Sequence, residues 1–261
     1  MSFENFLQRE WQDYCKVTPL AQMIHQLLSD QGEAIVNDHI ALRTLSHPSI
    51  GLEAFEEFFS KFDYKVCGEY EFEDKKLKAV HFEAANKPLV FVSEFLYEDE
   101  KFSDQMATIM ESLITTCADH SLLELFKLRR TWTPSFKTYE KLLQESEYAA
   151  WFYAWGFRTN HFTVSLNNFK KLSEVDQLNS FLKLNGIKLN TSGGEVKGTK
   201  EQGLMQSSTM ASQFKVDFVE GGFEIPSCYY EFAKRFEKDG QIYTGFVPTS
   251  ADKIFESTNR K

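Results

Sequence analysis

Cysteine is scarce in this sequence, and no two cysteines form a short motif. The four cysteines stand at positions 15, 67, 117 and 228, without a Cys-x-x-Cys pair. Such wide spacing argues against a zinc finger and against a small scaffold held by disulfides. We therefore expect four reduced, largely buried thiols in a cytoplasmic protein.

Positive charge is also in short supply. Lys and Arg number 29 against 38 Asp and Glu, which gives a formal net charge of −9 and a pI of about 5.3. Because binding of nucleic acid needs a clustered surplus of basic side chains, we expect no nucleic-acid partner. A single buried arginine can still bind a small anion locally, so an anionic substrate stays open.

Long apolar stretches are absent as well. No segment approaches the roughly 18–20 apolar residues of a membrane-spanning helix. The first residues, MSFENFLQREWQ, carry acidic side chains and lack the apolar core of a signal peptide. We expect no membrane partner, no signal peptide and a cytoplasmic location.

What the sequence does contain is enough apolar material for a large core. It has 261 residues, of which 42% are hydrophobic, and 25 of them are phenylalanine. A chain of this length buries most of its unfolded surface without a disulfide or a structural metal. Any metal site would therefore serve function rather than folding.

The order of apolar and polar residues predicts an α+β protein with an internal repeat. Helical spacing covers 3–31, with Pro19 where a second helix begins, and a β-α-β-β-β pattern follows over 34–96. A helical insert is predicted over 100–155. The first pattern returns over 158–236, where TNHFTVS repeats the strand NDHIALR with its histidine. The repeat predicts two modules within a single domain, 1–261. The elements expected in the second module are a helix at 173–185 and strands at 187–191, 203–210, 214–219 and 228–234.

Two histidines occupy equivalent places in the two modules, His39 and His161. Taken singly, each is more often a hydrogen-bonded strand residue than a ligand. Glu231 lies in the apolar strand YYEFAKR, where a carboxylate is costly to bury without a partner, although it could face outward on an edge strand. Together, two imidazoles and one carboxylate form the facial ligand set of non-haem iron(II) oxygenases. The donor types also suit Mn, Co, Ni or Zn, so the residues alone leave the metal open.

Several fragments resemble known families. The repeated modules are similar to the vicinal-oxygen-chelate superfamily, which includes glyoxalases and extradiol dioxygenases. This resemblance implies that the two modules form one curved sheet around a metal site and that residues 1–261 are a single catalytic domain. LMQSST (204–209), YYEFAKR (229–235) and GFVPTSADKIFEST (245–258) resemble the closing strand, the glutamate-ligand segment and the last helix of 4-hydroxyphenylpyruvate dioxygenases. The whole chain is most similar to the 2-oxoadipate dioxygenase/decarboxylases, also called 2-hydroxyglutarate synthases. The matching pieces are NDHIALR, TNHFTVS, YYEFAKR and FVPTSADKIF.

The resemblance implies a set of site residues. His39, His161 and Glu231 match the metal ligands, and the implied metal is Fe(II). Arg43 matches the arginine that holds the substrate and is the expected catalytic side chain. On a strand it shares a face with His39, about 13 Å along the chain, although a surface salt bridge is the alternative for it. Substrate contacts are expected from His39, Arg43, His161, Gln206, Thr249 and Ser250, of which Gln206 would also hydrogen-bond near the metal.

The resemblance also implies a reaction. A 2-oxo dicarboxylic acid, 2-oxoadipate, would react with O2 to give 2-hydroxyglutarate and CO2, as in lysine catabolism. The expected partners are therefore the small 2-oxo acid and O2, while the oligomeric state cannot be read from the sequence. A glyoxalase-like isomerase or hydrolase using Zn or Ni is one alternative. A non-catalytic ligand-binding module of the same fold is another, but an intact His-His-Glu set argues against it.

Overall fold

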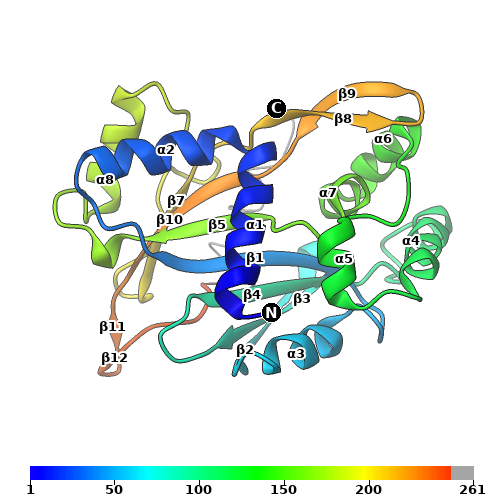
Figure 1. Cartoon of the computed structure of the whole chain (residues 1–261), viewed down its shortest axis with the longest axis horizontal. Coiled ribbons are helices and arrows are strands. Elements are labelled where there is room, and N and C mark those ends of the chain that lie inside the picture. The colour runs from blue at the N-terminus through cyan, green and yellow to red at the C-terminus, as the bar shows by residue number, and fades with distance from the viewer. Residues whose placement is uncertain (248–261) are drawn as a thin grey trace. The chain divides into compact units, whose positions relative to one another are not determined.

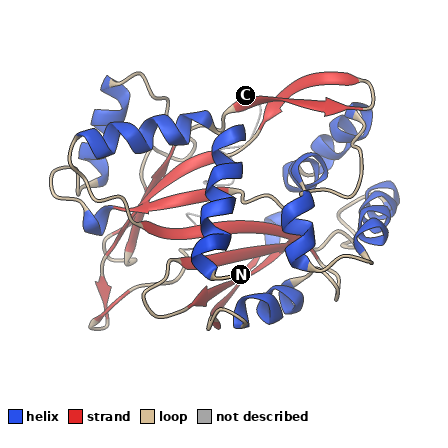
Figure 2. Ribbon diagram, viewed as in Figure 1, coloured by secondary structure: helices blue, strands red, loops and turns tan. Residues whose placement is uncertain are grey.

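The structure is a computed structural model that describes residues 1–247 (Figures 1 and 2). Thr249, Ser250 and all but the first three positions of the helix predicted over 245–258 lie outside the described residues. The chain divides into two compact units. The first unit consists of Met1–Glu10, Ala41–Thr159 and Phe214–Ile225. The second consists of Trp11–Ile40, Asn160–Gln213 and the chain from Pro226 onward.

The first unit carries strands in the order β2-β3-β4-β1 and most of the helices. Its strands are β2 (Lys65–Phe72), β3 (Leu77–Glu83), β4 (Leu89–Phe95) and the second half of β1 (Asn37–Leu45), with β8 (Gln213–Phe218) and β9 (Gly221–Pro226) apart from them. Its helices are α3 (Leu52–Ser60), α4 (Asp104–Cys117), α5 (Leu122–Leu128), α6 (Phe136–Glu145) and α7 (Glu147–Trp155). The predicted helical insert is thus confirmed as four helices, α4 to α7.

Phenylalanine rings build much of the core of this unit. Phe59 of α3 packs on Phe82 of β3 with ring centroids 5.6 Å apart, which fixes α3 against one face of the strands. Phe6, from the start of α1, meets Phe126 of α5 edge-on at 5.0 Å. Such tilted and edge-to-face pairs are the favoured arrangements of aromatic rings. The high phenylalanine content therefore stabilises this packing.

The second unit carries strands in the order β1-β5-β10-β7-β6. Its strands are the first half of β1, β5 (His161–Ser165), β6 (Lys197–Thr199), β7 (Leu204–Ser208), β10 (Tyr229–Arg235), β11 (Glu237–Lys238) and β12 (Gln241–Ile242). Its helices are most of α1 (Phe3–Val17), α2 (Pro19–Asp30) and α8 (Val175–Leu184). Strand β10 runs parallel to β5 and antiparallel to β7. The two predicted N-terminal helices, divided before Pro19, and the predicted helix at 173–185 are confirmed.

Two predicted strands of the second module behave differently from expectation. Residues 187–191 form only an isolated bridge, Leu189 to Thr209, because the chain turns soon afterwards at Gly193 and Gly194, where φ is +68° and +101°. The strand predicted at 214–219 forms, but it pairs with β9 in a two-stranded hairpin of its own. There Phe223 stacks on Phe136 of α6 at 3.8 Å, so the hairpin packs on the helical insert (Figure 1).

The cysteines and the helices test two further expectations. All four cysteines are free thiols, as predicted, but only Cys117 and Cys228 are buried, while Cys67 is exposed. Within residues 1–247, no helix is both long enough and apolar enough to cross a membrane.

Candidate metal centre

The three predicted ligands come together in the second unit. His39 lies on β1, His161 begins β5, and Glu231 is the third residue of β10. Potential donor atoms of the three side chains all lie within 4.8 Å of one another. The Nε2 atom of His39 is 3.5 Å from one carboxylate oxygen of Glu231, and Nε2 of His161 is 3.8 Å from the other. All three residues are at most 3% exposed, so the donor set is shielded from water.

Strand register explains this meeting. Because β10 runs parallel to β5 with Glu231 opposite Thr163 and Tyr229 opposite His161, these side chains point to the same face of the sheet. The hydroxyl of Thr163 lies 3.0 Å from Nε2 of His39 and 3.3 Å from Oε1 of Glu231. The ring of His161 stacks on Tyr229 at 4.6 Å. The neighbouring strand residues therefore limit how far the three donors can rotate.

Glu231 is poorly satisfied by the protein alone. Burial raises the pKa of Glu231 to about 8, although hydrogen bonds from Gln206 and Thr163 oppose the rise. Gln206 donates its amide to Oε1, whereas Oε2 has no hydrogen-bond partner among residues 1–247. A buried carboxylate oxygen without a donor is unfavourable, and a cation next to it would remove the cost.

The histidines present the nitrogen atoms that a metal would need. The Nδ1 atom of His39 is 2.7 Å from Oδ1 of Asp38, and Nδ1 of His161 is 2.9 Å from Oδ1 of Asn160. Each Nδ1 therefore acts as the donor, which leaves Nε2 with a lone pair directed to the Glu231 side. Metal-binding histidines are generally oriented in this way. Two imidazoles and one carboxylate without thiolate fit a divalent first-row metal, so the residues present fit the implied cofactor.

An arginine that the sequence did not indicate supports this cluster. Arg235 binds Asp38 through two hydrogen bonds of 2.8 Å each, from Nε and Nη2. Its Nη1 atom donates to the carbonyl oxygens of Tyr243 and Gly245, at 2.9 and 3.2 Å. Burial alone would raise the pKa of Asp38, but the charge of Arg235 and the bonds from His39 and Arg235 hold that pKa well below its ordinary value. Asp38 is therefore ionised beside His39.

Arg43 is a buried residue of the first unit. It is 2% exposed, which excludes the surface salt bridge considered for it. Its guanidinium lies 4.6 Å from the ring centre of Tyr148 and 4.8 Å from that of Trp151, and Nη1 donates to Glu147 at 3.2 Å. Tyr148 is itself fixed, since its hydroxyl donates to the Ser93 carbonyl at 2.6 Å. The guanidinium is therefore held in place by two aromatic rings and one carboxylate.

The remaining predicted site residues divide between two cases. Gln206 lies on β7 and hydrogen-bonds Glu231, while its predicted contact with the substrate stays a prediction. Thr249 and Ser250 lie outside the described residues. Sequence reasoning did not single out Thr163, Asn160 or Arg235. A usable signal existed for two of them, because Asn160 precedes His161 as Asp38 precedes His39, and Arg235 follows Glu231 by four residues on one strand.

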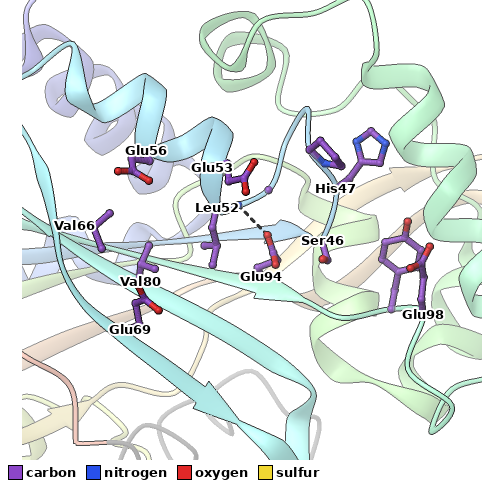
Figure 3. Close-up of a pocket in the computed structure, with 13 residues that line it drawn as sticks. Ser46, His47, Leu52, Glu53, Glu56, Val66, Glu69, Val80, Glu94 and Glu98 are labelled. Carbon is purple, nitrogen blue, oxygen red and sulfur yellow. Dashed lines mark hydrogen bonds between the residues drawn. The ribbon is translucent and has the colours of Figure 1, made fainter.

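A separate pocket of about 580 Å³ lies in the first unit (Figure 3). Five carboxylates line it: Glu53, Glu56, Glu69, Glu94 and Glu98. Glu94 accepts a hydrogen bond of 2.8 Å from the backbone N–H of Leu52 (Figure 3). It thereby caps α3, because the N-cap residue Gly51 has no side chain to do so. Glu94 thus has a structural role, and none of the predicted site residues lines this pocket.

Comparison with known proteins shows the family to which this chain belongs. The sequence profile of the 2-oxoadipate dioxygenase/decarboxylase family matches residues 12–119 and 118–236. The chain belongs to this family. Two members of the family, named as chloroplastic/amyloplastic in Oryza sativa and as chloroplastic in Arabidopsis thaliana, are each 32% identical over 94% of this chain, and the match covers 76% and 74% of their lengths. The cytoplasmic location expected from the sequence stays a prediction.

Solved structures of relatives agree with the family assignment. The hydroxyglutarate synthase from Oryza sativa, crystallised with 2-oxoadipate, superposes with a TM-score of 0.91 at 30% identity, covering 98% of this chain and 91% of that one. A Shewanella frigidimarina protein, provisionally assigned as a hydrolase, is 45% identical with a TM-score of 0.85, covering 94% and 97%. A Ralstonia eutropha protein assigned to the glyoxalase superfamily shares the fold at 21% identity and a TM-score of 0.74, covering 91% and 83%. The predicted α+β, glyoxalase-like fold of this 2-oxoadipate dioxygenase/decarboxylase family member is confirmed.

Proposed function

We propose that this chain is an Fe(II)-dependent enzyme that converts 2-oxoadipate and O2 to 2-hydroxyglutarate and CO2. The observation that carries the proposal is the buried His39, His161 and Glu231 donor set in a member of the family named for this reaction. A relative with 2-oxoadipate bound supports the choice of substrate. When bound, Fe(II) would supply open coordination positions for the 2-oxo acid and O2 and would pass electrons from the acid to O2.

The charges of the second unit suit an anionic substrate. Glu231 contributes one negative charge to a bound divalent ion, whereas the charge of Asp38 is balanced by Arg235. The loaded site therefore keeps a net positive charge, which attracts the carboxylate at the 2-oxo end of the substrate. Gln206 and Thr163 donate to Glu231 Oε1 and so orient that carboxylate. Because the donor set is buried, water is kept from competing with the substrate.

Arg43 is proposed to bind the second carboxylate of the substrate. It follows His39 by four residues on β1, and residues spaced by four on a strand point to the same face. Its guanidinium is held in place by Tyr148 and Trp151, so little rotational entropy is lost when a carboxylate pairs with it. A planar fork can bind such a carboxylate through two parallel hydrogen bonds. This pairing would favour dicarboxylic over monocarboxylic 2-oxo acids.

Oxygen uptake by the Fe(II)-loaded protein across a panel of 2-oxo acids tests the proposal. We expect uptake with matching CO2 release for 2-oxoadipate, at a higher rate than for 2-oxohexanoate, which lacks the second carboxylate. His39→Ala and His161→Ala should each lose both metal and oxygen uptake, whereas Glu33→Gln, outside the donor set, should keep both. Equal rates for 2-oxoadipate and 2-oxohexanoate would contradict the role of Arg43. If no 2-oxo acid stimulates oxygen uptake, the reaction itself is wrong.

A hydrolase is the second candidate, because the Shewanella frigidimarina relative is provisionally assigned as one. Both functions could use the same donor set, since imidazole and carboxylate also bind Zn. A hydrolase would be active with Zn and would consume no O2. The oxygen electrode with Zn-loaded and Fe(II)-loaded protein therefore separates the two functions.

A further inference from the structure

The residues directly before the two histidines differ between the modules. Asp38 precedes His39, and Asn160 precedes His161. We propose that Asp38 and Asn160 are positioning residues that make the two histidines unequal metal ligands, with His39 the stronger electron donor. The inference deepens the proposed function and rests on its metal site.

Both positioning residues impose the same orientation on the imidazole that follows. A carboxylate only accepts hydrogen bonds, so the contact of 2.7 Å with Asp38 requires a proton on Nδ1 of His39. The carbonyl oxygen of Asn160 accepts from Nδ1 of His161 at 2.9 Å in the same way. In a neutral imidazole the remaining nitrogen, Nε2, then carries a lone pair. In this respect the two modules are equivalent.

The charge of the two partners is where the modules differ. The Asp38 carboxylate is negative, whereas the Asn160 amide is neutral. A hydrogen bond from Nδ1–H to a charged acceptor is shorter and stronger, and it increases the electron density and basicity of the ring. Both partners are buried, so their effect on the ring is weakly screened. His39 therefore donates more charge through Nε2 than His161 does.

Arg235 stabilises the charged form of the Asp38 carboxylate. An isolated carboxylate as deeply buried as Asp38 would be costly to keep ionised. The two hydrogen bonds of 2.8 Å from Arg235 offset that cost and leave the oxygen next to His39 charged. On the other side, Nδ2 of Asn160 has no hydrogen-bond partner within residues 1–247. Among the described residues, therefore, His39 has a charged hydrogen-bond partner and His161 has a neutral one.

The experiment exchanges the two partners one at a time. Asp38→Asn gives both histidines an amide partner, and Asn160→Asp gives both a carboxylate. Glu10→Gln is the matched control, because Glu10 is a buried carboxylate whose oxygen lies 2.6 Å from Arg129, in the first unit and outside the donor set. Two quantities are measured for each protein, the affinity for Co(II) by competition with a chelator and the Fe(III)/Fe(II) midpoint potential.

We expect Asp38→Asn to weaken Co(II) binding by about 10- to 100-fold, as is usual when a partner of a ligating histidine is lost. We also expect it to raise the midpoint potential, because a poorer donor stabilises Fe(III) less. Asn160→Asp should lower the potential, because the positive charge of the bound iron favours the ionised form of the new carboxyl group. Glu10→Gln should change neither quantity. Shifts of opposite sign support the inference. Shifts of the same sign, or no shift in either variant, overturn it.

The same measurements distinguish a failure of this inference from misfolding of a variant and from a failure of the proposed reaction. If Asp38→Asn does not fold, the direction of the shift in Asn160→Asp decides alone. If the wild type binds Co(II) but its Fe(II) form takes up no oxygen with any 2-oxo acid, the proposed reaction fails while the comparison of ligands stands. If oxygen uptake is normal but neither the affinity nor the potential responds to these changes, only the inference fails.

Discussion

Replacing Glu231 by Gln exchanges a buried carboxylate for a neutral side chain of the same size. Burial raises the pKa of Glu231 to about 8 in the metal-free fold, from an ordinary value of 4.5. Between about pH 4.5 and pH 8, Glu231 therefore keeps its proton in the folded protein and has lost it in the unfolded chain. The stability that this group contributes is therefore complete below about pH 4.5 and is lost as the pH rises to about 8. Gln at this position cannot titrate.

The size of the effect follows from the two pKa values. Each tenfold change in proton affinity is worth about 1.4 kcal/mol, so the wild type without metal should lose about 5 kcal/mol by pH 8 relative to pH 4.5. At pH 7 the loss is roughly 3 kcal/mol. Metal-free Glu231→Gln should match the wild type in acid and exceed it in stability at neutral and alkaline pH. It should nevertheless bind no metal, because its amide is a poor ligand.

Urea denaturation of chelator-treated proteins between about pH 5 and pH 9 measures this difference. Glu33→Gln is the control of opposite sign. Burial would raise the pKa of Glu33, but hydrogen bonds from the backbone N–H groups of Lys170, Leu172 and Lys171 lower it below its ordinary value. Glu33 therefore stabilises the fold above the ordinary pKa, and Glu33→Gln should be less stable than the wild type at neutral pH. If the gap between Glu231→Gln and wild type does not widen with pH, the burial cost assigned to Glu231 is wrong.

Three other predictions concern Arg43, the neighbouring ring of Trp151, and Glu231. Arg43→Lys should lower kcat/KM for 2-oxoadipate by about 10- to 100-fold at unchanged metal content, because Lys keeps the charge but loses the planar fork. If oxygen-uptake kinetics stay within about twofold of wild type, Arg43 does not bind the second carboxylate of the substrate. Trp151→Leu removes one of the two rings that contact the guanidinium, a contact worth about 0.5–2 kcal/mol, and should raise KM several-fold in the same assay. Metal uptake at pH 7 should release about one proton per ion, because metal-free Glu231 is protonated at that pH. A titration with a pH-indicator dye measures this release, and no release would contradict the raised pKa of Glu231.

The sequence could predict the donor set because the internal repeat placed His39 and His161 at equivalent points of two strands. Glu231 could be added because a carboxylate in an apolar strand needs a partner and because YYEFAKR resembles the glutamate-ligand segment of a known family. The pairing of Asp38 with Arg235 was not, since the two residues are 197 positions apart and only strand order brings them together. Local pattern likewise predicted β8 as a strand but not its pairing. The hairpin of β8 and β9 contacts the helical insert where Phe223 stacks on Phe136, a contact between distant segments that local pattern does not show.

The late position of β10 in the chain has a consequence for biosynthesis. His39 is synthesised long before Glu231 and Arg235, because β1 precedes β10 in the chain. At about 5–20 residues per second, roughly ten seconds or more pass between the first ligand and the last. Throughout that time the nascent chain lacks the carboxylate and the arginine that complete the cluster. Binding of a metal by all three ligands therefore requires that β10 has been synthesised, and the metal content of a preparation should report the fraction of molecules that reached the native arrangement of β1, β5 and β10.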